Sequence, residues 1–179
     1  ADGIRALREQ GRAAVMAVLK KHTAATQDTI ALPRYWRFAA ELPRNAQAKI
    51  AAADFQTAFS EAQTAPGWPL EMENPAENEW QISSRVPLDL VYFGGHFAQF
   101  PLVPGVVELQ WVRDLAARFD WGRQSIVRVE NLKYQQFLRP NDEARVHLKF
   151  DADKNKLTFR LENTDAVCAS GRLVFGGFQ

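Results

Sequence analysis

The chain has 179 residues, close to one ordinary domain, and its 46% hydrophobic and 24% charged residues exclude disorder as the main state. No apolar run approaches the roughly 20 residues that cross a bilayer, and no signal-peptide pattern marks the start, so we expect a cytoplasmic protein without membrane insertion. The net charge of +1 and the single cysteine, Cys168, give no indication of nucleic-acid binding, an internal disulfide, a metal site or a cofactor.

The first third of the chain has helical spacing. Asp2 can cap a helix over about 3–22, and a second helix is predicted over 51–63. Between them, the aromatic run 35–38 is bounded by prolines and is compatible with a strand. Residues 65–69, Ala-Pro-Gly-Trp-Pro, then have the composition of a turn and a linker.

The linker predicts two domains, a small and mainly helical segment over 1–66 and a second unit over 67–179. In the second unit a long helix is predicted over 106–119, and its apolar residues occupy most of its circumference, so we expect burial on nearly every side. Apolar alternation predicts strands and one short extended piece around this helix, over 79–86, 90–93, 125–136, 144–150, 157–161 and 167–175. A long helix followed by an antiparallel meander indicates an α+β fold in which a sheet wraps a helix.

The stretch 93–107, Phe-Gly-Gly-His-Phe-Ala-Gln-Phe-Pro-Leu-Val-Pro-Gly-Val-Val, carries the clearest indication of chemistry. Neutral imidazole is the side chain best suited to take a proton near pH 7, and a glycine-flanked loop can hold His96 beside a substrate. Gly105 opens a helix, so its unpaired N–H can bind a thioester carbonyl as enolate charge develops. Together these groups describe removal of a proton from the carbon next to a thioester.

The same stretch resembles the G-H-F-x-x-x-P-x-x-P-G signature of the bacterial 3-hydroxyacyl-ACP dehydratases. Six positions fall in register, and the resemblance covers roughly residues 78–176; the six are Gly95, His96, Phe97, Pro101, Pro104 and Gly105. The following V-P-G-V-V-E-L-Q-W run is similar to that of the ApeI-like members found in aryl polyene and xanthomonadin-type pigment clusters.

This resemblance implies a hotdog fold, a 3-hydroxyacyl thioester substrate on acyl carrier protein or coenzyme A, and a homodimer whose sites form between subunits. It assigns His96 the role of base and the Gly105 N–H that of carbonyl donor. It also implies substrate contacts for Phe97, Pro104 and Val106.

The sequence departs from the dehydratase pattern at Gln110, where the family has an Asp or Glu that protonates the departing hydroxyl. An amide cannot act as that acid, and loss of a general acid typically costs about 10²- to 10⁴-fold in rate. Gln110 therefore indicates weakened dehydration, altered chemistry, or a role in orienting water or substrate. Glu108 and Asp114 are expected to be solvated helix residues rather than replacements.

Three further residues are expected to have no catalytic role. His147 alternates with apolar neighbours and is placed on the outward face of a strand, and His22 ends a helix. Cys168 is interpreted as a small buried hydrophobe.

Residues 42–50, L-P-R-N-A-Q-A-K-I, resemble the L-P-R-T-x-x-G-K-I motif near the C-terminus of adenylate-forming acyl ligases. The resemblance implies that Lys49 is the lysine that contacts the acyl-adenylate, while Ala48 replaces the usual glycine. Because the nucleotide-binding part of such ligases is absent here, Lys49 cannot catalyse adenylation within this chain. We interpret residues 1–66 as the end of a ligase C-terminal subdomain fused to the hotdog unit.

Three functions remain open from the sequence. The leading hypothesis is dehydration of a 3-hydroxyacyl thioester on acyl carrier protein. A second keeps the thioester pocket but hydrolyses the thioester, since water-orienting amides suit a thioesterase. The third is a non-catalytic hotdog that binds acyl chains or scaffolds the fused ligase.

Overall fold

The computed structural model describes residues 2–60, 62–95 and 97–176. It divides into two compact units, each assembled from segments that are separate in the sequence. The first unit comprises residues 1–64, 87–102 and 139–141, and the second comprises residues 65–86, 103–138 and 142–179.

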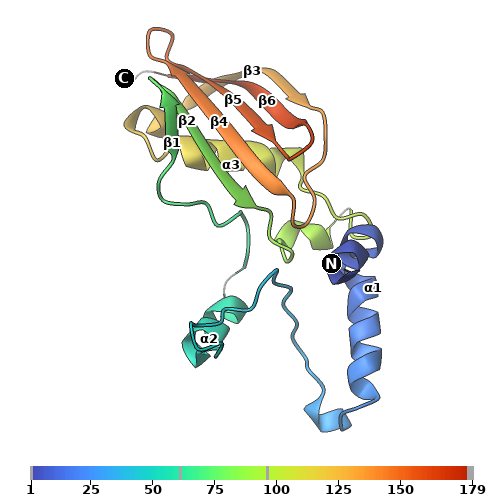
Figure 1. Ribbon diagram of the computed structural model, residues 1–179. Helices are drawn as coiled ribbons and strands as arrows, with labels where there is room; N and C mark the ends of the chain where they lie inside the picture. Colours follow the sequence, from blue (N-terminus) through green and yellow to red (C-terminus); the bar gives the residue numbers. More distant parts are fainter. Residues whose placement is uncertain (1, 61, 96, 177–179) are drawn as a thin grey trace. The chain divides into compact units, whose positions relative to one another are not determined.

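The second unit contains one six-stranded antiparallel sheet with the order β1-β2-β4-β5-β6-β3 (Figure 1). Its strands are β1 (Glu73–Ala76), β2 (Glu79–Arg85), β3 (Ile126–Tyr134), β4 (Glu143–Asp151), β5 (Lys156–Glu162) and β6 (Val167–Phe175). The five longer strands agree with the predicted ranges to within two residues at each end. The strand β1 was not predicted, because all four of its residues are exposed and give no apolar alternation.

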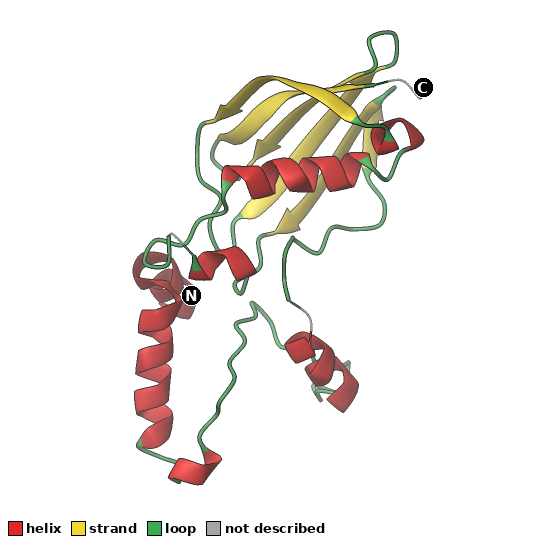
Figure 2. Cartoon of the chain, turned by 180° about the vertical axis from the view of Figure 1, so that it is seen from behind, coloured by secondary structure: helices red, strands yellow, loops and turns green. Residues whose placement is uncertain are grey.

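The helix α3 (Gly105–Ala116) lies across one face of this sheet in both views (Figures 1 and 2). Strands β4 and β5 bury every second residue, and their register pairs Val146 with Leu161 and Leu148 with Phe159 on the inward face. Full burial of such side chains stabilises a fold by about 1.5–3 kcal/mol each. The prediction of an antiparallel sheet around a central helix is therefore confirmed.

One face of α3 is open to solvent, so the expectation of burial on nearly every side is wrong. Val106 is 74% exposed, and Gln110, Arg113 and Asp114 are also exposed. The opposite face packs into the core through Trp111, Val112 and other apolar residues. Apart from Val106, the residues that α3 exposes are polar or charged, so the apolar residues cover less of its circumference than the prediction assumed.

After α3 the chain turns through a short 3-10 helix, η3 (Asp120–Arg123), which is anchored by aromatic stacking. The Trp121 ring stacks on Phe150 with centroids 4.2 Å apart and on Phe119 at 5.1 Å. Trp80 of β2 packs on Phe119 at 4.4 Å. This cluster joins the end of the α3 segment to strands β2 and β4 of the same unit.

The first unit is mainly helical. Its elements are α1 (Asp2–Ala24), η1 (Thr29–Ala31), α2 (Ala52–Ser60) and η2 (Val91–Gly94). Both predicted N-terminal helices are confirmed, although α1 is kinked at Gly11, which has a left-handed φ of 78°. A side chain there would collide with the backbone of Ala98, so glycine is required at the kink.

Two predicted extended segments of this unit are not strands. Residues 35–38 have no strand partner, and residues 91–94 form η2 instead of an extended piece. Near these segments the carboxylate of Asp89 is buried and pairs with the guanidinium groups of Arg12 and Arg37. The arginines, rather than strand pairing, hold this part of the chain together.

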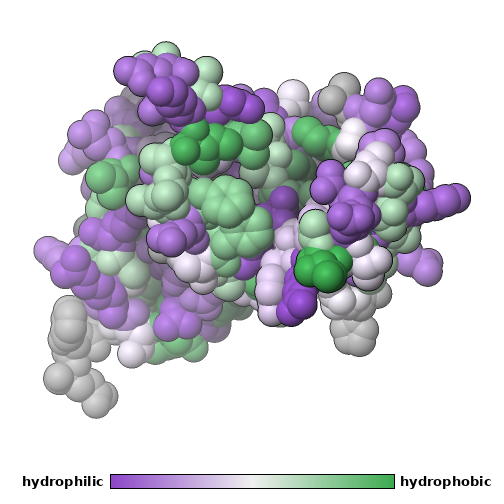
Figure 3. Space-filling view, turned by 90° about the horizontal axis from the view of Figure 1, so that it is seen from below, coloured by the Kyte–Doolittle hydropathy of each residue, from purple (hydrophilic) through white to green (hydrophobic). Residues whose placement is uncertain are grey.

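Several apolar side chains of the first unit stay exposed, including Ile30, Tyr35, Leu42 and Phe55. On the face shown in Figure 3, apolar groups lie between hydrophilic ones. Among the described residues, no helix has both the length and the apolar character needed to span a membrane.

Candidate active site

The start of α3 presents unused backbone donors. Pro104 is the N-cap in an extended conformation, and its carbonyl accepts hydrogen bonds from the N–H groups of Val107 (2.9 Å) and Glu108 (3.2 Å). The N–H groups of Gly105 and Val106 have no backbone acceptor among the described residues. Because the helix dipole adds partial positive charge at this end, these two donors suit a carbonyl oxygen that becomes negative.

Tyr134 of β3 packs against Gly105 at the start of α3, which requires a glycine at this position. A Cβ at Gly105 would lie 2.6–2.9 Å from three carbons of the Tyr134 ring, closer than van der Waals contact allows. The absence of a side chain therefore lets the ring lie directly against the start of the helix. This brings a half-exposed phenol to the same place as the free N–H groups.

Gln110 lies on the exposed face of α3, together with Val106. Its side-chain Nε2 donates to Oδ1 of Asp114 at 2.6 Å, one helical turn further on. Asp114 is exposed, as predicted. The side-chain N–H of Gln110 therefore already has a carboxylate partner. The side-chain carbonyl oxygen of Gln110 can accept a hydrogen bond from a ligand at this face.

Glu108 contradicts the prediction of a solvated helix residue. It is only 2% exposed, because steps of three and four residues along α3 place it on the same face as Trp111, Val112 and Leu115. Burial raises the pKa of Glu108 to about 8, although a hydrogen bond from the backbone N–H of Leu138 opposes the shift. The Oε2 atom is buried and has no hydrogen-bond partner among the residues that the structure describes. Its spacing with Val112 and Leu115 was the sequence signal that could have revealed this.

The loop before α3 belongs to the first unit and carries the other predicted site residues. His96 lies outside the described residues. Phe97 is half-exposed, and its carbonyl accepts a hydrogen bond from the N–H of Phe100 at 2.9 Å. The Phe100 ring lies under the guanidinium of Arg139 at 3.7 Å. The structure thus brings together Pro104, Gly105, Val106 and Gln110 along α3 and leaves Phe97 in a separate unit.

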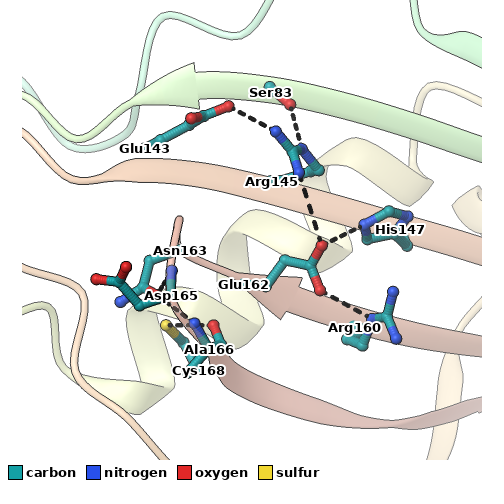
Figure 4. A network of polar contacts seen from close by, with 10 residues as sticks. All are labelled: Ser83, Glu143, Arg145, His147, Arg160, Glu162, Asn163, Asp165, Ala166 and Cys168. Atoms are coloured by element: carbon teal, nitrogen blue, oxygen red, sulfur yellow. Dashed lines mark hydrogen bonds and ion pairs between the residues drawn. The ribbon is translucent and has the colours of Figure 1, made fainter.

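The outward face of the sheet holds a network of charged side chains (Figure 4). His147 Nε2 contacts Glu162 Oε1 at 2.9 Å, and the same carboxylate contacts Arg160 at 3.1 Å and Arg145 at 3.9 Å. The outward position predicted for His147 is confirmed. Cys168 is fully buried, as predicted, and its burial raises the pKa of the thiol to about 12.

A family model described as ApeI-like, ApeI dehydratase, matches residues 72–172, which is more than half of the chain. The chain belongs to the ApeI-like dehydratase family. The matched region contains the whole sheet apart from the end of β6, together with α3 and the glycine-histidine loop. The predicted family is thereby confirmed for this part of the chain.

Solved structures show the same fold as this ApeI-like unit. The dehydratase heterocomplex ApeI:P from Xenorhabdus doucetiae is 29% identical, has a TM-score of 0.57, and its alignment covers 63% of this chain and 99% of that chain. An uncharacterized protein from Erwinia carotovora subsp. atroseptica is 27% identical with a TM-score of 0.56, and the alignment covers 64% of this chain and 98% of that chain. The hotdog-type α+β fold is confirmed.

Among curated proteins, the 3-hydroxyacyl-acyl-carrier-protein dehydratase FabZ of Lactococcus lactis subsp. lactis is 27% identical over 82 residues. The alignment covers 42% of this chain and spans 57% of the length of that relative. Relatives of the ApeI-like unit therefore include dehydratases, which are lyases.

Lys49 lies outside the part of the chain that matches the ApeI-like family. It is exposed, in a tight loop where Asn45 Oδ1 accepts hydrogen bonds from the backbone N–H groups of Gln47 and Lys49, both at 3.0 Å. Ala48 in this loop has a left-handed φ of 59°. This conformation gives a physical reason for the glycine that the ligase motif carries at the same position.

Proposed function

We propose that the chain dehydrates a 3-hydroxyacyl thioester held on acyl carrier protein, with coenzyme A as the alternative carrier. The observation that carries the proposal is the start of α3, where unused N–H groups at Gly105 and Val106 lie within the segment matched to a dehydratase family. The carrier protein is inferred from the name of the FabZ relative.

In the proposed reaction His96 takes a proton from C2 of the substrate. The Gly105 N–H donates to the thioester carbonyl and stabilises the enolate charge that develops there. The electron pair left at C2 forms the C2–C3 double bond, and the C3–O bond breaks. The hydroxyl takes up a proton and leaves as water. Phe97, Pro104 and Val106 are proposed to contact the acyl chain or its linker, and Gln110 to orient water or substrate.

An exposed apolar surface at one edge of the sheet in the hotdog unit supports pairing with a second subunit. The strand β3 is at the edge of the sheet, and exposed apolar residues run along it and onto α3; this edge surface consists of Val106, Val127, Val129, Leu132 and Tyr134. An apolar sheet edge favours pairing with another chain. We propose a homodimer, with a hetero-pair as the alternative because ApeI of Xenorhabdus doucetiae is part of a heterocomplex.

Residues 1–66 are proposed to be the end of a ligase C-terminal subdomain. The support is the 42–50 motif and its loop, in which Ala48 adopts the conformation that glycine favours. In this proposal Lys49 has no catalytic role within the chain itself.

The direct test is mass spectrometry of a 3-hydroxyacyl carrier protein incubated with the full chain. Loss of one water is the expected result. Loss of the acyl chain instead would identify a thioesterase, and an unchanged carrier would identify a non-catalytic acyl-binding protein. Both of these outcomes contradict the proposal.

The matched variants are His96→Ala and His147→Ala, which make the same substitution in the glycine loop and on the outward face of the sheet. His96→Ala should lower the dehydration rate by about 10²- to 10⁴-fold, because the base is lost. His147→Ala should keep the rate, since His147 contacts only the outward network around Glu162. Unchanged dehydration in His96→Ala would contradict its role as base.

A further inference from the structure

Tyr134 places a phenol ring against the start of α3. It is the last residue of β3 and pairs with the buried Ala169 of β6, so its side chain lies on the inward face of the sheet, over which α3 packs. Three carbons of its ring would lie 2.6–2.9 Å from a Cβ at Gly105. The ring therefore occupies the space that a side chain would take at the first residue of the helix.

This contact brings the phenol hydroxyl close to the unused N–H groups. The ring carbon Cζ would lie 2.7 Å from that Cβ, and the phenol oxygen is one bond further, so it is no more than about 4 Å from the same point. The N–H of Gly105 is attached to the same Cα. A thioester carbonyl bound to this N–H at about 2.9 Å therefore lies next to the Tyr134 side chain.

The Tyr134 hydroxyl is available as a donor. The side chain is 47% exposed, and its O–H has no hydrogen-bond partner in the described part of the chain. Burial of the rest of the side chain raises the pKa of the phenol above its ordinary value of 10.0, and the charge of Glu108 raises it further. The phenol thus keeps its proton at neutral pH and can donate one hydrogen bond.

The surroundings of the phenol would change on pairing with a second subunit. Tyr134 belongs to the edge surface, which is proposed to contact that subunit. A partner that covers this surface removes water from the phenol and from the start of α3. A hydrogen bond to a negatively charged oxygen is stronger in such a place than in water. The pairing that completes the site would therefore also strengthen this donor.

We propose that the Tyr134 hydroxyl donates a hydrogen bond to the thioester carbonyl oxygen of the substrate, beside the N–H of Gly105, and stabilises the enolate that forms there. The inference rests on the proposed dehydration and adds a side-chain donor to the two backbone donors of α3. The phenol keeps its proton throughout, so no bond forms or breaks at Tyr134. The proton removed by His96 and the departing hydroxyl are unaffected.

The test compares Tyr134→Phe with Tyr35→Phe in the full chain, each measured in dehydration of the 3-hydroxyacyl carrier protein. Tyr134→Phe keeps the ring that packs against Gly105 and loses only the hydroxyl, so kcat should fall by about 10²- to 10³-fold. Tyr35 is 81% exposed in the first unit, and its variant should keep the wild-type kcat. Circular dichroism and size-exclusion chromatography establish that both variants keep the fold and the oligomeric state of the wild type.

The division of the loss between kcat and KM provides a readout that a structural role would not reproduce. The proposed hydrogen bond strengthens as negative charge develops on the carbonyl oxygen, so the loss should be in kcat, with KM nearly unchanged. A group that only packs against the bound substrate would raise KM instead. A wild-type kcat with a raised KM in Tyr134→Phe would overturn the proposal.

The outcomes separate this inference from the proposed function. If the wild type releases no water, the proposed function fails. If the wild type dehydrates and Tyr134→Phe dehydrates equally fast, the function stands and the role of Tyr134 is overturned. An equal loss of kcat in Tyr35→Phe would also overturn it, because the effect would not depend on a hydroxyl at the start of α3.

Discussion

At the scale of single residues, the burial of Glu108 of α3 differs from the solvated position that the sequence predicted. Residues two apart on a helix are rotated by about 200°, so Glu108 and Gln110 point to opposite sides. Gln110 is exposed, and its amide donates a hydrogen bond to Asp114, whereas Glu108 is a buried carboxyl group. Burial is what decides their chemistry, because it keeps a proton on Glu108 at neutral pH.

Glu108 should make the stability of the chain depend on pH. Burial raises the pKa of Glu108 in the folded chain to about 8, above its ordinary value of 4.5, so the folded state binds an extra proton between these two pH values. Stability from this group is fully present below about pH 4.5 and is lost as the pH rises toward 8. Between pH 5 and 8 the free energy of unfolding should fall by on the order of 3 kcal/mol relative to Glu108→Gln. Urea unfolding of both proteins across this range measures it, and parallel curves would contradict it.

Because the backbone of Ala48 is left-handed, we expect that replacing this residue by glycine stabilises the chain. Its φ of 59° costs an alanine about 1–2 kcal/mol, whereas glycine adopts it freely but loses about 0.5–1 kcal/mol in chain entropy. Ala48→Gly should therefore raise the free energy of unfolding of the first unit by about 0.5–1 kcal/mol. Ala46→Gly is the matched control: its φ is not positive, and it should destabilise instead. Thermal unfolding followed by circular dichroism compares them; equal shifts for both variants would contradict the argument.

At the scale of elements, the strength of the sequence pattern decided what could be predicted. Strands β4, β5 and β6 bury alternate residues, so their apolar period is regular and their bounds were predicted closely. The strand β1 is exposed throughout and gave no signal, and the apolar residues of η2 have no helical period and were wrongly predicted as an extended piece. The aromatic run at 35–38 has the composition of a strand but no neighbouring strand to pair with.

The residues of the candidate site were also only partly predictable from the sequence pattern. The motif residues were predictable because Gly105 and Pro104 shape the backbone locally, and the structure places them at the start of α3. The burial of Glu108 depends on the sheet that covers it, which the sequence pattern of one helix does not specify. A polar residue within an apolar stripe is the only local sign of such a group.

The element η3 depends on one side chain. Trp121 stacks between Phe119 and Phe150, and it also meets Phe175 edge-on at 5.8 Å. Trp121→Ala should lower the free energy of unfolding by about 3 kcal/mol, because it removes the stacking and leaves a cavity. Trp121→Phe keeps an aromatic ring and should cost about 1 kcal/mol. Urea unfolding monitored by circular dichroism distinguishes them, and an unchanged midpoint in Trp121→Ala would show that η3 is held in another way.

At the scale of the whole molecule, the exposed part of the hotdog unit is informative about assembly. The edge surface combines an unpaired sheet edge with apolar side chains, and the open face of α3 adjoins it through Gly105 and Tyr134. In the register of the sheet Val129 pairs with the buried Leu173, so it lies on the inward face yet remains exposed. A residue of this kind is well placed to be covered by a partner.

Val129→Lys should therefore break the proposed dimer. Burying an unpaired ammonium group at an apolar contact costs several kcal/mol, which weakens association by about 10²-fold or more. The control is Thr158→Lys, which adds the same charge on the outward face of the central strand β5, where Thr158 is exposed. Light scattering after size-exclusion chromatography should show a monomer for Val129→Lys and a dimer for the wild type and Thr158→Lys. Because the proposed site is completed between subunits, dehydration by Val129→Lys should fall together with the dimer fraction. A dimeric Val129→Lys, or a monomeric wild type with full activity, would place the pairing surface elsewhere or make it unnecessary.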